Sequence, residues 1–184
     1  MINYILKKVI RRIRGQVDVE DLKKCGMKVG ENFYKDARAI IDPSWCWLVE
    51  IGNNVTLAPN VHILAHDAST KYKLGYTKIG TVNIKDNVFI GANTIVLPNV
   101  TIGEDSIIGA HSIVTHDIPP NSLAFGVPAR VVGKAEDYIN KQKEKMEESD
   151  TPIYDESFTL LGCISDSKKI QMKEELKKRI GFVK

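Results

Sequence analysis

Aliphatic residues recur along the middle of the chain with a period of six. In blocks of six that run from Ile51 to a break after Ala68, and again from Ile84, every block begins with Ile, Leu or Val. This period matches neither the 3.6 residues of a helical turn nor the two-residue alternation of a lone strand. It fits short flat faces that meet at corners, with each first residue pointing inward. The nine first positions are Ile51, Leu57, Ile63, Ile84, Ile90, Val96, Ile102, Ile108 and Val114.

Three such blocks close one triangular coil of about 18 residues, and coils stack at strand spacing, about 4.8 Å apart. The second position is small in most blocks, and we expect it to let the chain turn. Val29 and Ile41 indicate a less regular first coil, followed by a register slip of four residues before Ile51. The complete coils in this register are 51–68, 84–101 and 102–119.

Residues 69–83 interrupt the repeat. An insertion in a stack of coils must leave the stack as a loop, and such loops often line a binding face. His66 falls where the last regular block runs into this loop. We therefore expect a partly exposed imidazole beside a cleft.

The segments on either side of the repeat predict helices. Residues 2–14 place apolar residues at helical spacing on one face and five basic residues on the other, which predicts an amphipathic helix. This segment contains no acidic residue, so it carries the basic excess of a chain whose net charge is +3. It is predicted either to cap the open end of the stack or to contact an anionic membrane surface. Residues 134–149 and 167–184 predict two charged helices joined by a linker. The expected organisation is an N-terminal helix and cap over 1–25, a repeat domain over 26–133 and a helical tail over 134–184.

Composition narrows the class of protein. The chain has 184 residues, 43% hydrophobic and 27% charged, as expected for one globular domain with an appendage. No apolar run approaches the roughly 18 residues needed to span a bilayer, and no secretion signal is evident. Three well-separated cysteines form no zinc pattern and predict free thiols in the cytoplasm. Because the basic excess is confined to one short segment, no nucleic-acid partner is expected.

The motif IGANTIVLPNVTIGEDSIIGAHSIVTHDIPPNSLAFGVPARVVG, preceded by DPSWCWLVEIGNNVTLAPNVHILAHDAS, resembles the hexapeptide-repeat acetyltransferases. Within that family it resembles the sugar and polysaccharide O-acetyltransferase branch. The resemblance implies a mainly β fold, a left-handed parallel β-helix of hexapeptide repeats with an N-terminal amphipathic helix and a C-terminal helical tail. It also implies a homotrimer that uses acetyl-CoA and no metal.

The same resemblance implies a catalytic residue. The stretch LAHDAS aligns His66 with the family's catalytic histidine, and a histidine suits the role of general base because its usual pKa lies near neutrality. We expect Asp67, or a backbone carbonyl, to fix the tautomer of the imidazole. His62 is the rival candidate, although its block position predicts a corner residue.

Other positions match the family's coenzyme site. Ala92 and Ala110, at equivalent places on successive coils, match residues whose backbone contacts the pantetheine arm. Thr115 and His116 match a Thr-Lys pair near the coenzyme, with His in place of Lys. Arg130, in VPAR, matches a phosphate-binding arginine, a role suited to a guanidinium.

The acceptor pocket is less well defined by the sequence. Trp45 could stack on a sugar face or fill the irregular coil, and Asp42 could bind a sugar hydroxyl or hold an Asp-Pro turn. Asp67 is a further candidate acceptor contact. Arg38 replaces an Asn of the family's small-sugar acetyltransferases, which argues against their free-sugar acceptors.

The sequence thus predicts a cytoplasmic homotrimer that moves an acetyl group from acetyl-CoA to a hydroxyl of a cell-surface polysaccharide or its lipid-linked precursor. A peripheral membrane contact through residues 2–14 is compatible with this interpretation. The alternatives are an N-acetyltransferase acting on an amine, a γ-type carbonic anhydrase-like zinc enzyme and a non-catalytic β-helix assembly module. The zinc alternative rests on the four histidines, His62, His66, His111 and His116.

Overall fold

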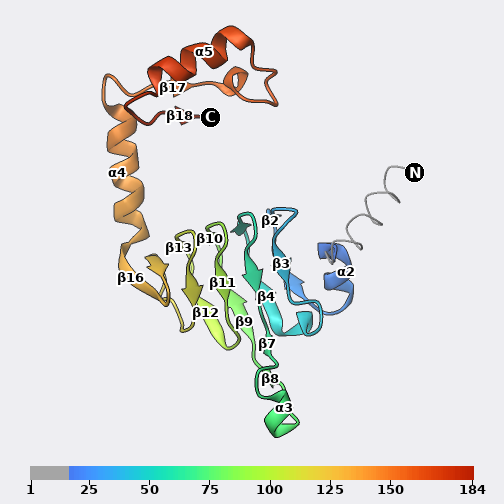
Figure 1. Ribbon diagram of the computed structural model, residues 1–184. Helices are drawn as coiled ribbons and strands as arrows, with labels where there is room; N and C mark the ends of the chain where they lie inside the picture. The colour runs from blue at the N-terminus through green and yellow to red at the C-terminus, as the bar shows by residue number, and fades with distance from the viewer. Residues whose placement is uncertain (1–16) are drawn as a thin grey trace, which may run out of the picture. The chain divides into compact units, whose positions relative to one another are not determined.

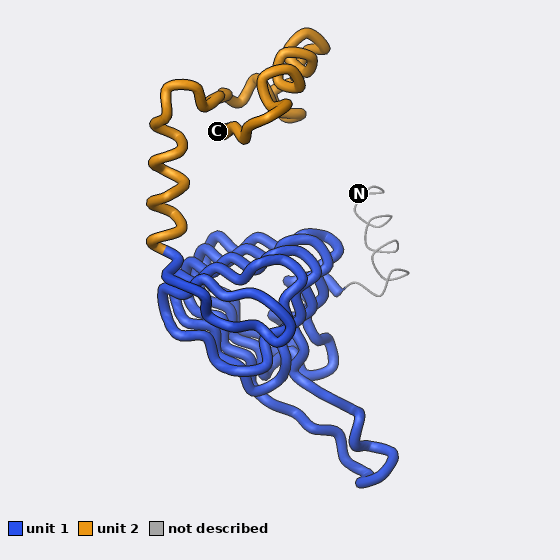
Figure 2. The backbone as a smooth tube through the Cα atoms, turned by 60° about the vertical axis from the view of Figure 1, so that its left-hand side comes forward, with its two compact units in different colours: residues 1–135 blue, residues 136–184 orange. Residues whose placement is uncertain are grey.

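The computed structural model describes residues 17–184 (Figure 1). The segment 2–14, for which an amphipathic helix is predicted, lies outside the described residues. The chain divides into two compact units, residues 1–135 and 136–184, which we call unit 1 and unit 2 (Figure 2). In the described part of either unit, no helix has the length and apolar character needed to cross a lipid bilayer.

Unit 1 is a stack of coils whose short strands form three sheets (Figure 1). Strands on neighbouring coils run parallel, so the predicted mainly β fold with parallel sheets is confirmed. The first sheet contains β1 (Lys28–Val29), β4 (Val49–Ile51), β9 (Val82–Ile84) and β12 (Val100–Ile102). The second contains β2 (Tyr34–Lys35), β5 (Thr56–Leu57), β10 (Phe89–Ile90), β13 (Ile107–Ile108), β15 (Ser122–Gly126) and the antiparallel β16 (Ala129–Lys134). The third contains β3 (Ile40–Ile41), β6 (His62–Ile63), β11 (Ile95–Val96) and β14 (Ile113–Val114).

The strand register confirms the six-residue period. Ile84 lies between Ile51 and Ile102 in the first sheet, and Ile90 pairs with Leu57 in the second. All nine first-position side chains are buried, none more than 4% exposed. A fully buried aliphatic side chain contributes about 1.5–3 kcal/mol relative to an exposed one. The coils are therefore held together by one continuous apolar column.

The corners turn at the fourth residue in seven of the nine blocks, so the expectation that the second residue makes the turn is wrong. Asn is the usual fourth residue, and its backbone adopts the left-handed region that Asn tolerates better than most residues. The amides also stack, as where Asn54 Nδ2 donates to Asn87 Oδ1 at 2.8 Å. The small second residue serves another purpose, because a Cβ on Gly91 would lie 2.5 Å from the backbone nitrogen of Ala110. The corner asparagines are Asn32, Asn54, Asn60, Asn87, Asn93, Asn99 and Asn121.

The first coil is irregular, as predicted. Ile41 pairs with Ile63, and these two residues lie farther apart along the chain than Ile84 and Ile102, which pair between regular coils. The extra residues of the first coil contain the 3₁₀ helix η1 (Cys46–Leu48). These extra residues set the register in which the first coil pairs with the second.

The segment that interrupts the repeat between coils, predicted as a loop over residues 69–83, is a β-hairpin that projects from the coils (Figures 1 and 2). β7 (His66–Asp67) pairs antiparallel with β8 (Lys78–Ile79), and α3 (Lys71–Leu74) forms the tip. Gly75 ends α3 with φ at 75°, a conformation that favours glycine. We call residues 66–79 the hairpin. Its first strand already includes His66, so the excursion begins before the predicted start at residue 69, and Val82 has returned to the first sheet.

A short helix, α2 (Val19–Lys24), precedes the first coil. The Asp18 side chain accepts a hydrogen bond from Glu20 N at its start, as expected for a helix N-cap. Leu22 and, beyond the helix, Met27 join the apolar column, with 2% and 4% exposure. Leu22 and Met27 thus extend the apolar column to the residues that precede the first coil.

Unit 2 contains helices within both segments for which helices are predicted, and it also contains a short pair of strands. Its second helix ends well before Gly181, and residues 182–183 pair instead with residues 153–154, in the segment expected to be a linker. The elements are α4 (Ala135–Glu147), β17 (Ile153–Tyr154), η2 (Glu156–Phe158), α5 (Asp166–Glu175) and β18 (Phe182–Val183).

Candidate active site

His66, at the base of the hairpin, contacts a buried carboxylate on the preceding coil. Its Nδ1 hydrogen-bonds to Oδ2 of Asp42. Asp42 is 1% exposed, whereas the His66 side chain keeps 31% of its surface exposed. Because a carboxylate only accepts hydrogen bonds, Nδ1 carries the proton and Nε2 is left as an acceptor. The exposed imidazole can therefore take up a proton at Nε2.

Backbone amides fix the position of the Asp42 carboxylate. Oδ1 accepts hydrogen bonds from Ser44 N at 2.9 Å and Trp45 N at 3.4 Å, and Oδ2 accepts one from Ala65 N at 3.0 Å. These bonds to Ser44 N and Trp45 N fit the alternative in which Asp42 holds the Asp-Pro turn. The hydrogen bonds of its carboxylate run to His66 and to the backbone.

Trp45 forms one wall beside the histidine. The centroids of its ring and the His66 imidazole lie 4.5 Å apart, with the planes tilted by 42°. Trp45 also packs on the apolar column, while Trp47 is 55% exposed. Trp45 is thus near the candidate base, and it restricts the orientations open to the imidazole.

Asp67 pairs across the hairpin. Its carboxylate contacts Lys78 Nζ at 2.7 Å and accepts a hydrogen bond from Ser69 N at 2.8 Å. The bond from Lys78, followed by that from Ser69, holds the pKa of Asp67 well below its usual range. Asp42 therefore occupies the tautomer-fixing position that we expected for Asp67, and Asp67 stabilises the base of the hairpin.

The other three histidines have different surroundings. His62 lies within β6 between Ile40 and Ile95, so the corner position predicted for it is wrong. His111 is a corner residue with φ at 57°, and its Nε2 lies 3.3 Å from Asn93 Nδ2. His116 Nδ1 lies 2.7 Å from Thr115 Oγ1. Among residues 17–184, no group of three or more His, Cys, Asp or Glu side chains is placed to hold a metal ion.

Four of the five predicted coenzyme residues lie at two corners of the coil. Ala92 and Ala110 lie between the second and third sheets, on successive coils. Thr115 and His116 lie between the third and first sheets, which is the corner that also carries His66. The third sheet separates the two corners, so one chain does not bring these four residues to one place.

Arg130 lies on β16 opposite Phe125 and is exposed. Its Nη1 donates to the carbonyl of Ala129 at 2.9 Å. No carboxylate of residues 17–184 lies within ion-pairing distance of its guanidinium. The charge is available to an anionic ligand.

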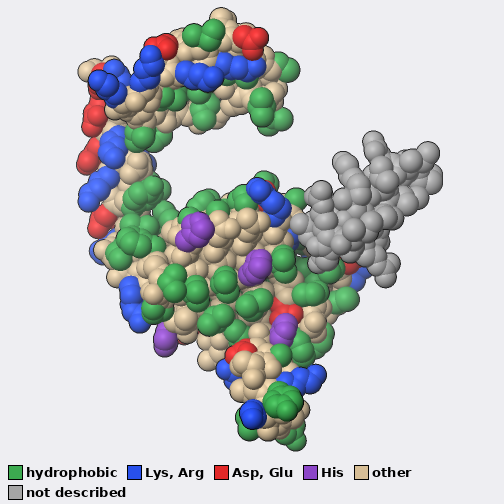
Figure 3. Space-filling model, in the orientation of Figure 1, with side chains coloured by type: hydrophobic (Ala, Val, Ile, Leu, Met, Phe, Trp, Pro, Cys, Tyr) green, Lys and Arg blue, Asp and Glu red, His purple; other side chains and the backbone are tan. Residues whose placement is uncertain are grey.

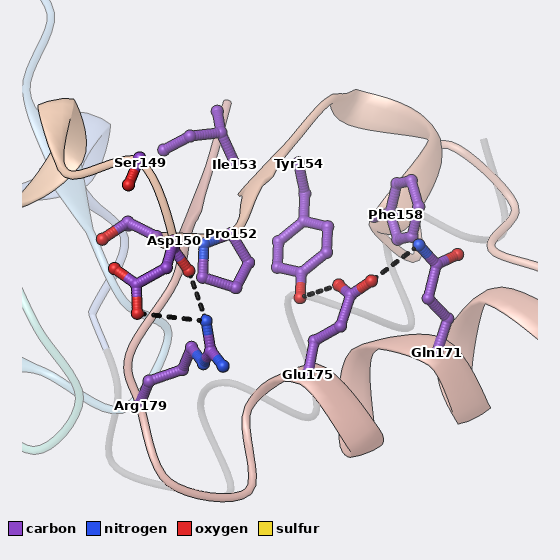
Figure 4. Close-up of a pocket in the computed structure, with 10 residues that line it drawn as sticks. Ser149, Asp150, Pro152, Ile153, Tyr154, Phe158, Gln171, Glu175 and Arg179 are labelled. Carbon is purple, nitrogen blue, oxygen red and sulfur yellow. Dashed lines mark hydrogen bonds and ion pairs between the residues drawn. The ribbon is translucent and has the colours of Figure 1, made fainter.

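Unit 2 contains a separate cavity of about 530 Å³ (Figure 4). Its polar lining is internally paired: Tyr154 donates to Glu175 at 2.7 Å, and Arg179 donates to the carbonyl of Asp150 at 2.5 Å. Burial, together with the bond to Glu175, raises the pKa of Tyr154 to about 12. None of the predicted site residues lines this cavity, and its paired groups serve to hold unit 2 together.

Comparison with known proteins identifies relatives of unit 1. The family model for bacterial transferase hexapeptide (six repeats) matches residues 81–116. The galactoside O-acetyltransferase of Escherichia coli K12 is 42% identical over 113 residues, which are 59% of this chain and 54% of that protein. The chain spans about half the length of the curated relatives that it matches first.

Solved structures give the same result. A maltose O-acetyltransferase from Clostridium difficile 630 superposes with a TM-score of 0.52 and 44% identity, over 59% of each chain. A galactoside acetyltransferase in complex with coenzyme A superposes with a TM-score of 0.51 and 32% identity, over 65% of this chain and 70% of that one. The six-residue coil architecture and these similarities show that the chain belongs to the hexapeptide-repeat acetyltransferase family.

Proposed function

We propose that this protein transfers an acetyl group from acetyl-CoA to a hydroxyl of a sugar unit in a cell-surface polysaccharide or its lipid-linked precursor. The observation that carries this proposal is the hydrogen bond between the partly exposed His66 and the buried Asp42, at the point where the hairpin leaves the coils. Similarity to proteins named galactoside and maltose O-acetyltransferases supports the reaction class.

His66 acts as the general base. Its Nε2 accepts the proton of the sugar hydroxyl as the oxygen forms a bond to the acetyl carbonyl carbon. The resulting imidazolium is stabilised by the negative charge of Asp42, and Nε2 then returns the proton to the departing thiolate. The products are the sugar acetate and the free thiol of coenzyme A. Neither step requires a covalent bond between the acetyl group and the protein.

Acetyl-CoA supplies the acetyl group in the activated form of a thioester. We assign its binding to Ala92, Ala110, Thr115, His116 and Arg130. Ala92 and Ala110 have small side chains at a corner between the second and third sheets, which suits close approach of the pantetheine arm. Arg130 is exposed and has no carboxylate within ion-pairing distance in residues 17–184, as suits a phosphate ligand.

The complete site requires a second copy of the chain. His66 and the pair Ala92 and Ala110 lie at different corners, so the site forms where the corner of one copy meets another corner of its neighbour. A cyclic homotrimer of left-handed β-helices satisfies this condition at three equivalent interfaces. We assign the transferase domain to residues 26–133 and place the protein in the cytoplasm. Residues 2–14 supply a peripheral membrane contact that would bring the site to lipid-linked acceptors.

A transfer assay with a glycan panel tests the proposal. Full-length protein is incubated with acetyl-CoA and each glycan, thiol release is followed with a chromogenic disulfide, and products are analysed by mass spectrometry. We expect an acetyl ester on at least one saccharide, and its loss in His66→Ala. Acetylation of amino groups only would replace the proposal by an N-acetyltransferase, and thiol release without acetylated product would leave only thioester hydrolysis.

A further inference from the structure

We propose that the hairpin selects a negatively charged saccharide as acceptor, with Lys71 and Lys73 attracting its carboxylate or phosphate groups and Tyr72 and Tyr76 contacting its sugar rings. This inference rests on the proposed function, because it names the acceptor class of the same site.

The hairpin is joined directly to the candidate base. His66 lies opposite Ile79 in the β7–β8 ladder, so the first pair of the hairpin includes the reacting residue. The ion pair of Asp67 with Lys78, at 2.7 Å, ties the two strands together at the next position. Thr70 Oγ1 donates to the carbonyl of Tyr76 at 2.9 Å and closes the tip. A sugar chain held by the tip is therefore held on the structure that carries His66.

The charge of the hairpin is opposite to that of the coils around it. The hairpin, residues 66–79, contains three lysines and one acidic residue, whereas residues 29–65 and 80–133 together contain four basic and eight acidic residues. Lys78 is neutralised by Asp67. Lys71 and Lys73 are exposed, and no carboxylate in the described part of the chain lies within ion-pairing distance of either. Two positive charges thus remain at the tip to attract an anion.

Two tyrosines stand beside these charges. Tyr72 is 92% exposed and Tyr76 is 79% exposed, and Lys73 Nζ lies 5.5 Å from the centroid of the Tyr72 ring. Lysine and hydrophobic side chains gather over the hairpin in the space-filling view (Figure 3). Exposed apolar surface bordered by polar groups marks interaction sites, and a tyrosine offers a flat ring together with a hydroxyl. The tip therefore presents apolar rings and cations together, the combination that an acidic pyranose would contact.

The distribution of residues favours a saccharide over a membrane surface. A helix that lies in a membrane presents one continuous apolar face. α3 has only four residues, and lysines alternate with Tyr72 and Leu74 along it. The tip therefore cannot bury an apolar face without also burying Lys71 or Lys73, whereas a polyanion in water contacts both kinds of side chain.

The test compares matched acceptors. We would measure kcat/KM for tetragalacturonate and for the same tetramer after reduction of its carboxylates to neutral alcohols, using wild type and Lys71→Gln/Lys73→Gln. A second pair, maltotetraose with and without a terminal phosphate, tells carboxylate from phosphate recognition. The control is Lys141→Gln/Lys143→Gln, which removes two exposed lysines with the same spacing from α4. Electrostatic attraction at an exposed site accounts for about tenfold or more in kcat/KM at low salt.

We expect wild type and the α4 control to favour a charged tetramer, and the hairpin variant to lose that preference while it retains its rate on the neutral one. Equal losses on charged and neutral tetramers, or no charge preference in wild type, would overturn the inference. Co-sedimentation with phosphatidylglycerol vesicles that depends on Lys71 and Lys73, without any charge preference among tetramers, would assign the hairpin to lipid instead.

Binding measurements separate this inference from the proposed function. If wild type acetylates no tetramer, calorimetric titration with the same compounds still decides the role of the hairpin. Binding of a charged tetramer that is lost in Lys71→Gln/Lys73→Gln would uphold the inference while the transfer proposal fails. Absence of preferential binding to the charged tetramers would overturn it.

Discussion

His66 donates Nδ1–H to the carboxylate of Asp42, which lies 24 residues earlier in the chain and on the preceding coil. Ser44, Trp45 and Ala65 supply three further donors from the backbone, so the carboxylate is held from several sides. The pair joins an immobile buried anion to an imidazole that retains access to solvent. This arrangement defines the tautomer in which Nε2 is the free acceptor.

Removal of the base tests the assignment of His66. A general base contributes about 10²–10⁴-fold to the rate, so His66→Ala should lower kcat by that order. The KM for acetyl-CoA and the oligomeric mass should stay unchanged, because the coil does not depend on this side chain. His62→Ala is the matched control and should retain activity. Loss of activity in His62→Ala with normal turnover in His66→Ala would reassign the base.

Asp42→Asn tests the orienting bond separately. The amide of Asn can donate to Nδ1, which favours the tautomer with the proton on Nε2 and removes the acceptor. We expect kcat to fall by about 10²-fold or more, since the equivalent change in a serine protease triad costs about 10⁴-fold through the same cause. The ¹⁵N chemical shifts of the imidazole should report the change of tautomer. A large loss of activity with an unchanged tautomer would indicate that Asp42 acts only through the fold.

Arg130→Ala tests the coenzyme assignment. Loss of a hydrogen bond to a charged group costs about 1.5–3 kcal/mol, or roughly ten- to over a hundredfold in affinity. The KM for acetyl-CoA should rise by that factor, with little change in the KM for the acceptor. Arg179→Ala in unit 2 removes an arginine that is already paired with Asp150 and is the control. An unchanged KM for acetyl-CoA in Arg130→Ala would remove this residue from the site.

The core was predictable from sequence because burial repeats with the period of the coil. Ile51, Ile84 and Ile102 stack on one another whatever the path of the loops between them. The turning residue was also visible in the sequence, as Asn at the fourth place of successive blocks such as Asn54 and Asn87. We attributed the turn to the second residue, whose small size instead permits the close approach of neighbouring coils.

The partner of His66 was not predictable from the pattern. Asp42 reaches His66 because the residues around η1 lengthen the first coil and shift Ile41 onto Ile63. The number of extra residues in the first coil can be read from the sequence, but the course of the backbone through them is set by packing. Asp67, the neighbour in sequence, is drawn to Lys78 by a hairpin that the repeat pattern does not describe. The residue next to His66 in sequence, Asp67, is therefore not the one that hydrogen-bonds to its imidazole.

Unit 2 should lose stability in alkali. The pKa of Tyr154 is raised from 10.0 to about 12, so the fold favours the neutral phenol. This contribution to the free energy of unfolding is fully present below pH 10 and is lost as pH rises toward 12. Amide exchange of β17 and β18 should accelerate over that range in wild type. Tyr154→Phe should show a weaker dependence in the same range, and an equal dependence in both proteins would exclude Tyr154 as the cause.

Mixed oligomers test whether the site is shared between copies. His66→Ala removes the base from one corner, and Ala110→Trp fills the other corner with a bulky ring. Each variant alone should be inactive, because every interface lacks one of the two parts. In randomly mixed trimers, about a quarter of the interfaces combine an intact His66 from one copy with an intact Ala110 from its neighbour. Co-expression of the two variants should therefore restore a corresponding share of wild-type activity. If the two corners served the same reaction within one chain, no mixture would recover, and the mixed oligomers would remain as inactive as either parent.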